Sequence, residues 1–259
     1  MKALKRVYLG LVLFFLYAPI LIMIFLSFNG GKSWAQWGGF SVKPYVDIFT
    51  QDGLTDALIV TVTIALLASV VSTVIGTLAA IGIFAMKKKP QGLMMSLTNI
   101  PMTMPDIVTG VSLLLLFIFL NVKTGYVTML LAHITFDVPY VIVSVLPKLK
   151  QMNKHSYEAA LDLGATPFYS LVHVIIPEIL PGIITGAILS FTLSIDDFTI
   201  SYFAASGSGV QNLSTLIYSS ARKGIKPWLF SLSTIMFVVM LVLLILINRP
   251  SKEEKAAKL

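Results

Sequence analysis

The chain contains no cysteine among its 259 residues. This absence excludes a disulfide framework, a thiolate metal site and a cysteine nucleophile. Charged residues are also scarce, at 12%, whereas soluble domains typically carry about 25%. Hydrophobic residues make up 56% of the chain, and the mean hydropathy is +0.87. The composition therefore excludes an ordinary soluble domain and predicts a polytopic membrane protein.

Motifs for nucleotide binding and catalysis are missing as well. The GKS at 31–33 resembles part of a P-loop, but the glycine required five positions before Gly31 is Leu26. No Gly-x-Ser-x-Gly sequence occurs, and the histidines lack zinc-ligand spacing, since they stand far apart at His133, His155 and His173. We therefore expect no catalytic residue, metal site or cofactor in this chain, and a membrane enzyme ranks well behind a transporter.

Long apolar runs predict an all-α fold with six membrane-spanning helices, because about 20 apolar residues cross about 30 Å of hydrocarbon. The expected spans are 7–28, 57–86, 93–120, 125–147, 178–204 and 228–248. Pro101 and Pro105 predict a kink or a re-entrant start in the third span, since proline removes a backbone hydrogen bond.

The expected organisation follows from these spans. Residues 1–56 hold the first span and an outer loop, residues 57–248 form a core of the other five spans, and residues 249–259 form a cytoplasmic tail. The first apolar run is longer than the roughly 7–15 residues of a signal-peptide core, so we expect a retained span.

Lysine and arginine are divided unevenly between the loops. With the N-terminus inside, 13 of the 19 basic residues fall in cytoplasmic segments. The outer segments hold the remaining six: Lys32, Lys43, Lys123, Arg222, Lys223 and Lys226. The bias predicts both termini in the cytoplasm, and it accounts for the net charge of +7 without nucleic acid as a partner. The basic loop 222–226 is the exception, and is either a solvated loop or faces an acidic partner.

The loop between the fourth and fifth spans predicts a polar-faced helix. Ser156 can cap its start, and Glu158 and Asp162 share one face at a spacing of four residues. Ala159 and Ala160 permit close approach of another surface. Gly164 is placed to end the helix with a positive φ, and Thr166-Pro167 predicts the cap and first turn of a second short helix. Like charges on one face indicate a basic partner surface, and an interfacial helix lying on membrane lipid is the alternative.

This segment, EAALDLGATPFYSLVHVIIPEILPGI, resembles the EAA signature of the membrane subunits of ABC importers (type I). Glu158, Ala159, Ala160 and Gly164 match its core, and the closing pattern matches either Ile176-Pro177 or Leu180-Pro181. The resemblance implies a coupling helix at about 156–170 that docks onto a separate ATPase, which holds ATP and Mg. Asp162 is included in the expected ATPase-coupling residues because it shares the face of Glu158.

Four carboxylates fall within the apolar runs: Asp106, Asp137, Asp196 and Asp197. A carboxylate at membrane depth costs several kcal/mol and marks a pathway or a pair. The acids therefore predict a cation pathway. The alternative is helix capping for Asp106 and pairing with Ser or Thr hydroxyls for the other three, and it is weaker for the adjacent Asp196 and Asp197 because no Lys or Arg lies within a span to neutralise them. The aromatic side chains that could pack around an alkyl-ammonium group are Tyr140, Phe198 and Tyr202.

Three further segments resemble the second permease subunit of spermidine/putrescine importers: MPDIVTGVSLLLLF, AHITFDVPYVIV and LSFTLSIDDF. This resemblance implies a second homologous permease subunit, two ATPase subunits, an external polyamine-binding protein and a place in the bacterial cytoplasmic membrane. Two other functions stay open: a permease of the same fold for another solute, such as ferric ion, thiamine or an oxyanion, and a stand-alone cation transporter or channel. An anion would require basic groups in the spans, and a stand-alone transporter would not require the loop helix.

Overall fold

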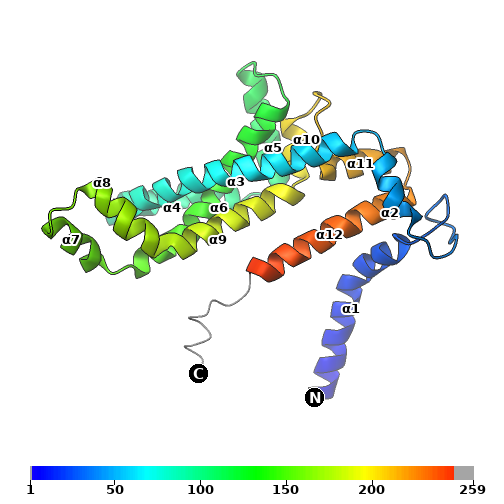
Figure 1. The fold of residues 1–259 in the computed structure, drawn as a ribbon, viewed down its shortest axis with the longest axis horizontal. Helices are drawn as coiled ribbons and strands as arrows, with labels where there is room; N and C mark the ends of the chain where they lie inside the picture. Colours follow the sequence, from blue (N-terminus) through cyan, green and yellow to red (C-terminus); the bar gives the residue numbers. More distant parts are fainter. Residues whose placement is uncertain (1, 248–259) are drawn as a thin grey trace. The chain divides into compact units, whose positions relative to one another are not determined.

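Helices make up the regular secondary structure of the protein. The computed structural model describes residues 2–247. The helices shown in Figure 1 are α1 (Lys2–Leu26), α2 (Lys43–Asp47), the 3-10 turn η1 (Ile48–Thr50), α3 (Leu54–Ala85), α4 (Lys88–Thr103), α5 (Asp106–Phe119), α6 (Tyr126–Gln151), α7 (Lys154–Asp162), α8 (Pro167–Ser170), the π-turn η2 (Leu171–Ile175), α9 (Ile176–Asp196), α10 (Thr199–Ala204), α11 (Leu213–Lys223) and α12 (Pro227–Ile247). Over these residues there is no β-strand, only an isolated bridge between Asn29 and Phe40. The predicted all-α fold is confirmed.

Five of the described helical segments are long and apolar enough to span a membrane. They are Lys5–Leu26, Leu54–Ala85, Tyr126–Gln151, Pro167–Asp196 and Pro227–Ile245. Helices α4 and α5 make a sixth span if they are counted together, although they are bent by 103° at their junction. Met104 and Pro105 have the extended ψ angles of 145° and 137° there. The predicted break in the third span is confirmed, because proline disfavours a helical conformation in the residue before it.

The expected fifth span, 178–204, is wrong at both ends. The apolar helix runs from Pro167 to Asp196 through α8, η2 and α9. It stops there because Asp197 leaves the helical conformation, with φ −59° and ψ 131°. A separate helix, α10, then begins at Thr199. The sequence showed one apolar run across this junction, whereas hydrogen bonds of the Asp197 side chain separate the two helices.

The chain clusters into two compact units. Unit 1 comprises Met1–Asp56 and Leu213–Leu259, and unit 2 comprises Ala57–Asn212. This division by packing places α12 with α1. The division expected from the sequence instead grouped α12 with a permease core at 57–248. That division was drawn from the segment shared with the family and not from packing, so it stays a prediction. The expected tail, 249–259, lies outside the described residues.

In unit 1, the loop after α1 is organised around the fully buried Asn29. Its side-chain oxygen accepts hydrogen bonds from the N–H groups of Gly31 and Gly38 at 2.9 and 2.8 Å. Its amide nitrogen donates to two carbonyls of the same loop. Helix α1 packs against α12, and Ser231 Oγ donates to the carbonyl of Ser27 at 2.8 Å. One buried amide therefore holds the loop that leads into α2.

In unit 2, α6 and α9 lie side by side (Figure 1), and small residues of α3 and α9 allow the three helices to approach closely. A Cβ atom at Gly76 of α3 would lie 2.6 Å from Val141 Cβ, and one at Gly186 of α9 would lie 3.2 Å from Val141 Cα. Ser72 of α3 and Ser190 of α9 are hydrogen-bonded at 2.8 Å. Small residues and hydroxyl pairs are the usual means of close helix packing in a membrane. The resulting three-helix core positions the acids of α6 and α9.

Candidate functional site

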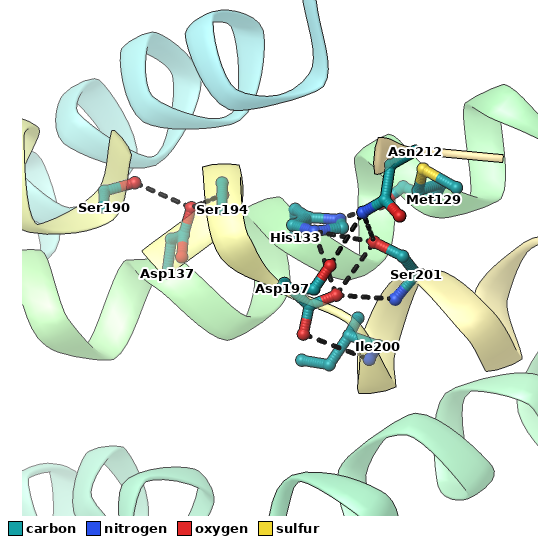
Figure 2. Close-up of polar contacts among 9 residues, drawn as sticks. All are labelled: Met129, His133, Asp137, Ser190, Ser194, Asp197, Ile200, Ser201 and Asn212. Carbon is teal, nitrogen blue, oxygen red and sulfur yellow. Dashed lines mark hydrogen bonds and ion pairs between the residues drawn. The ribbon is translucent and has the colours of Figure 1, made fainter. Parts of the chain in front are cut away.

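The junction between α9 and α10 is held by the carboxylate of Asp197 (Figure 2). One oxygen accepts a hydrogen bond from the N–H of Ile200 at 3.2 Å. The other accepts from the N–H and the hydroxyl of Ser201, at 2.7 and 2.8 Å. The first N–H groups of a helix lack partners within the helix, and a negative charge there is favourable. Asp197 thus anchors the start of α10.

A histidine from α6 faces this carboxylate. His133 Nε2 lies 3.4 Å from Asp197 Oδ2, and the His133 side chain is only 1% exposed. Its Nδ1 donates to the carbonyl of Met129 at 2.8 Å, so this nitrogen carries a proton. Because the single hydroxyl proton of Ser201 is directed to Asp197, a proton on Nε2 completes the contact. The geometry therefore suits an imidazolium–carboxylate pair linking α6 to the α9–α10 junction.

The amide of Asn212 closes the group, which we call the acid–histidine cluster: His133, Asp197, Ser201 and Asn212. Asn212 Nδ2 donates to the Asp197 carbonyl at 2.7 Å and to Ser201 Oγ at 2.8 Å (Figure 2). Both contacts tie the segment before α11 to the junction, and His133 ties α6 to it. The cluster thus fixes where α9 ends, and with it the position of Asp196.

Asp137 lies one turn beyond His133 on α6 but has different partners. Its Oδ2 accepts from Ser190 Oγ at 2.7 Å and from Ser194 Oγ at 2.8 Å (Figure 2). Asp137 is fully buried, and its Oδ1 has no hydrogen-bond partner among the described residues. The serine pairing that the sequence left as an alternative is thus present. In this structure Asp137 stabilises the contact between α6 and α9.

The loop helix is α7, and its boundaries are mostly as expected. Gly164 has φ +88°, which a left-handed helix end requires. Thr166 caps α8 by accepting from the N–H of Tyr169, and Pro167 is at its first position. The expected cap Ser156 is wrong: Asn153 caps α7 through the N–H of His155. Asn153, like Ser156, is a polar residue of the loop between the spans. The amide oxygen of asparagine caps a helix N-terminus as well as the hydroxyl of serine does.

A side chain that the sequence did not single out links α7 to the fifth span. Glu178 in the first turn of α9 accepts a hydrogen bond from the N–H of Asn153 at 3.1 Å. On α7 itself, Glu158 is exposed and lies 3.5 Å from His155. Leu163, which follows the end of α7, and Phe168 of α8 are 89% and 75% exposed. The segment thus presents acidic and apolar groups outward and is tied to α9 by a direct contact.

Comparison with known proteins gives the family. The model of the binding-protein-dependent transport system inner membrane component family matches residues 72–249. This chain belongs to that family. It is 37% identical over 243 residues to the spermidine/putrescine transport system permease protein PotC of Haemophilus influenzae, and the alignment covers 94% of each chain. It is 38% identical to the putrescine transport system permease protein PotI of Escherichia coli, over 85% of this chain and 81% of that one.

Solved structures agree with the family fold. A bacterial ABC transporter for the import of alginate superposes with a TM-score of 0.69 at 17% identity, covering 95% of this chain and 96% of that chain. The MetNI methionine ABC transporter gives 0.60 at 18% identity, covering 76% and 94%. The resemblance to importer permeases that the EAA-like segment carried is confirmed. As a family member, the chain is a multi-pass inner-membrane transport component and not an enzyme.

Within this permease fold the predicted pathway acids separate into two kinds. Asp137 and Asp197 are engaged inside unit 2. Asp106 and Asp196 are exposed; Asp106 is the first residue of α5, and Asp196 is the last of α9. A Cβ atom at Gly110 would lie 2.9 Å from Phe203, so α5 packs tightly on α10. The helices that carry Asp106 and follow Asp196 are thus in contact.

Two of the three predicted aromatic residues, Phe198 and Tyr202, lie at the start of α10 and within it. Phe198 and Tyr202 have ring centroids 5.5 Å apart, and Tyr202 is 41% exposed. Tyr140 packs against Phe136 at 5.3 Å. The structure therefore groups Phe198 and Tyr202 beside the α9–α10 junction, whereas Tyr140 lies along α6. The roles of these residues in transport, and of the α7 residues in coupling, stay predictions.

Sequence reasoning missed His133, although a signal was present. The expected spans contain no lysine or arginine that could pair with the doubled acid, and the spacing of the three histidines relates only to the question of a zinc site. His133 stands four residues before Asp137, so the two share a face of α6. A titratable residue one turn from a membrane acid is the pattern that would have marked His133 as a candidate, although its contact with Asp197 depends on the fold.

Proposed function

We propose that this permease is a membrane subunit of an ATP-driven polyamine importer. The observation that carries the proposal is the pair of adjacent acids, Asp196 and Asp197, at the break between α9 and α10. Asp197 faces His133 within the fold, with Oδ2 3.4 Å from Nε2. Asp196 is exposed at the helix end. The relatives named for spermidine and putrescine transport support a substrate with ammonium groups.

The pathway in this proposal is built from exposed carboxylates and aromatic faces. Asp106 and Asp196 attract the ammonium groups, which lose part of their hydration as they enter. Phe198 and Tyr202 contact the alkyl chain and the adjacent positive charge by cation–π attraction. Asp137 and Tyr140 form the wall rather than the contact surface in this conformation. Weak, distributed contacts of this kind let a polycation leave as well as enter.

Coupling in this proposal runs through α7. Glu158, Ala159, Ala160, Asp162 and Gly164 form the surface that an ATPase subunit grips. Because Asn153 is hydrogen-bonded to Glu178, a displacement of α7 acts on the start of α9. The complete importer contains a second permease subunit, two ATPase subunits and an external binding protein. Both termini of this chain then face the cytoplasm, in agreement with the lysine distribution.

Radiolabelled polyamine uptake tests the proposal. The complete importer is expressed in cells that lack their own polyamine importers, with an Asp196→Asn variant alongside. We expect uptake that unlabelled spermidine or putrescine suppresses and that ferric ion, thiamine and oxyanions do not. If ferric ion, thiamine or an oxyanion suppressed the uptake instead, the protein would be a permease of the same fold for that solute. Uptake by this chain without an ATPase partner would favour a stand-alone transporter.

A further inference from the structure

A small cavity in unit 1 collects lysines from two distant parts of the chain. It has a volume of about 240 Å³ and lies between the loop after α1 and the start of α12. Its lining includes Lys32, Lys43 and Lys226, together with Asp47 and the buried Trp228. We call it the lysine cavity. Half of the six basic residues assigned to outer segments thus meet at one place.

The lysine cavity keeps a net positive charge, because three lysines and one carboxylate, Asp47, line it. Among the side chains that the structure describes, the ion pairs are His133–Asp197 and His155–Glu158. None of the three cavity lysines therefore has a carboxylate within 4.0 Å in the described chain. The N-terminus of α12 at Pro227 adds the partial positive charge of a helix start. The cavity consequently favours an anionic occupant.

Two other basic residues of the same outer loop have local roles. Arg222 and Lys223 lie in the last turn of α11, where positive charge is favoured by the helix dipole. Arg222 also lies over the ring of Tyr218, with its guanidinium carbon 5.9 Å from the ring centroid. Lys226, in contrast, lines the cavity. The basic loop 222–226 therefore divides into a helix end and a cavity wall.

We propose that the lysine cavity receives acidic side chains of the external binding protein when that protein docks. The proposal rests on the proposed function for the side of the membrane and for the partner. The cavity is smaller than the roughly 300–1,000 Å³ of typical small-molecule sites, and one or two carboxylate side chains suit it better. Its charge repels a polyamine, so it does not belong to the substrate pathway.

The chemistry of the partner fits the same surface. A protein that captures a polycation needs carboxylates around its cleft, and those at the rim are free to meet lysines on a permease. An alginate transporter with a similar fold, at a TM-score of 0.63 and 16% identity, was solved in complex with its periplasmic protein. Complementary charge of this kind speeds encounter and fixes the docking orientation.

The test measures the affinity of the binding protein for the complete importer in nanodiscs. A triple variant, Lys32→Gln with Lys43→Gln and Lys226→Gln, is compared with the wild type from low to high salt. We expect at least about tenfold weaker binding at low salt and a flatter salt dependence, because exposed charge pairs are screened by salt. ATPase activity without the binding protein should stay the same, which shows that the variant is assembled.

The matched control is Arg222→Gln with Lys223→Gln, which removes outer charge away from the cavity. It should change the affinity by less than about twofold, as expected of screened charges that make no contact. Unchanged binding in the triple variant, or equal weakening in the control, would overturn the proposal. A third result would also overturn the proposal: the triple variant binds the binding protein normally but has lost affinity for anionic phosphatidylglycerol vesicles. The occupant of the cavity would then be a lipid headgroup.

A second measurement uses the absence of cysteine from the chain. Lys43→Cys supplies a unique thiol for cross-linking to single cysteines placed at acidic rim positions of the binding protein. We expect a cross-link at rim acids and none at acids on the opposite face, and the reverse pattern would contradict the docking site. Docking does not depend on the solute, so cavity-dependent binding without polyamine uptake would refute the polyamine function and leave this inference intact.

Discussion

The acid–histidine cluster of unit 2 and the lysine cavity of unit 1 treat charge in opposite ways. In the cluster, Asp197 is surrounded by donors and faces His133 at 3.4 Å. In the cavity, three lysines converge without a carboxylate within ion-pair distance in the described chain. A charge that is matched within the fold holds helices together. A charge left unmatched at an accessible surface is available to a ligand or a partner.

Breaking the matched pair should give the largest effect. Asp197→Ala leaves a buried imidazole beside Ser201 and removes the acceptors of the α10 N-terminus. Loss of one partner of a buried pair typically costs about 3–5 kcal/mol. We expect strongly reduced thermal stability and no measurable uptake, read from detergent unfolding curves and transport assays.

A double-mutant cycle sharpens this prediction. The double variant His133→Asn with Asp197→Asn should lose less free energy of unfolding than the two single variants lose together. Each single variant leaves its partner without its counterpart, whereas the double variant removes both partners. Additive losses would show that the two side chains do not interact.

An exposed acid on α7 should give the next largest effect without loss of stability. Glu158→Lys reverses a charge that lies outside the packed core, so the unfolding temperature should stay within a few degrees. We expect substrate-stimulated ATPase activity to fall about tenfold or more, since like charges at an interface suppress docking. The matched control is Lys154→Glu, which reverses a charge of the opposite sign on the same helix. Normal coupling in Glu158→Lys would contradict a docked α7.

Asp196→Asn tests the other half of the adjacent pair. Because Asp196 is exposed and Asp197 is not, this variant should assemble and remain stable. Uptake should show a KM raised about tenfold, as expected when a charge-assisted contact worth about 1.5 kcal/mol is lost. Asp197→Asn should be clearly less stable than Asp196→Asn. Equal destabilisation of the two variants would remove the distinction between a structural and a substrate-facing acid.

The smallest effect is expected at Glu178. Glu178→Gln keeps an acceptor for the Asn153 N–H but removes its charge, at a cost below about 1 kcal/mol for a partly exposed hydrogen bond. Uptake should fall about two- to threefold while ATPase activity persists, which indicates looser transmission from α7 to α9. Glu178→Leu, which removes the acceptor, should give the larger loss, and identical rates in both variants would exclude this contact from coupling.

Sequence reasoning reached the fold because its signals are local. Apolar length set the spans, Pro105 set the break before α5, and Gly164 and Thr166 set the turn after α7. It placed the end of the fifth span wrongly because the determinant is the Asp197 side chain, whose acceptors compete with helix continuation. It missed His133 and the lysine cavity because both depend on contacts between residues far apart in the chain. Lys32 and Lys226 share no pattern before folding brings them together.

Helix α3 has a consequence for the membrane around the importer. At 32 residues it is about 48 Å long, whereas α12 has 21 residues and a length of about 32 Å. A hydrocarbon layer of about 30 Å matches α12 but is far shorter than α3. The longer helix must therefore tilt, extend beyond the acyl chains or thicken the bilayer beside it. Since Ser72 and Gly76 connect α3 to the helices that carry the acids, lipid chain length becomes a variable that reaches the transport pathway.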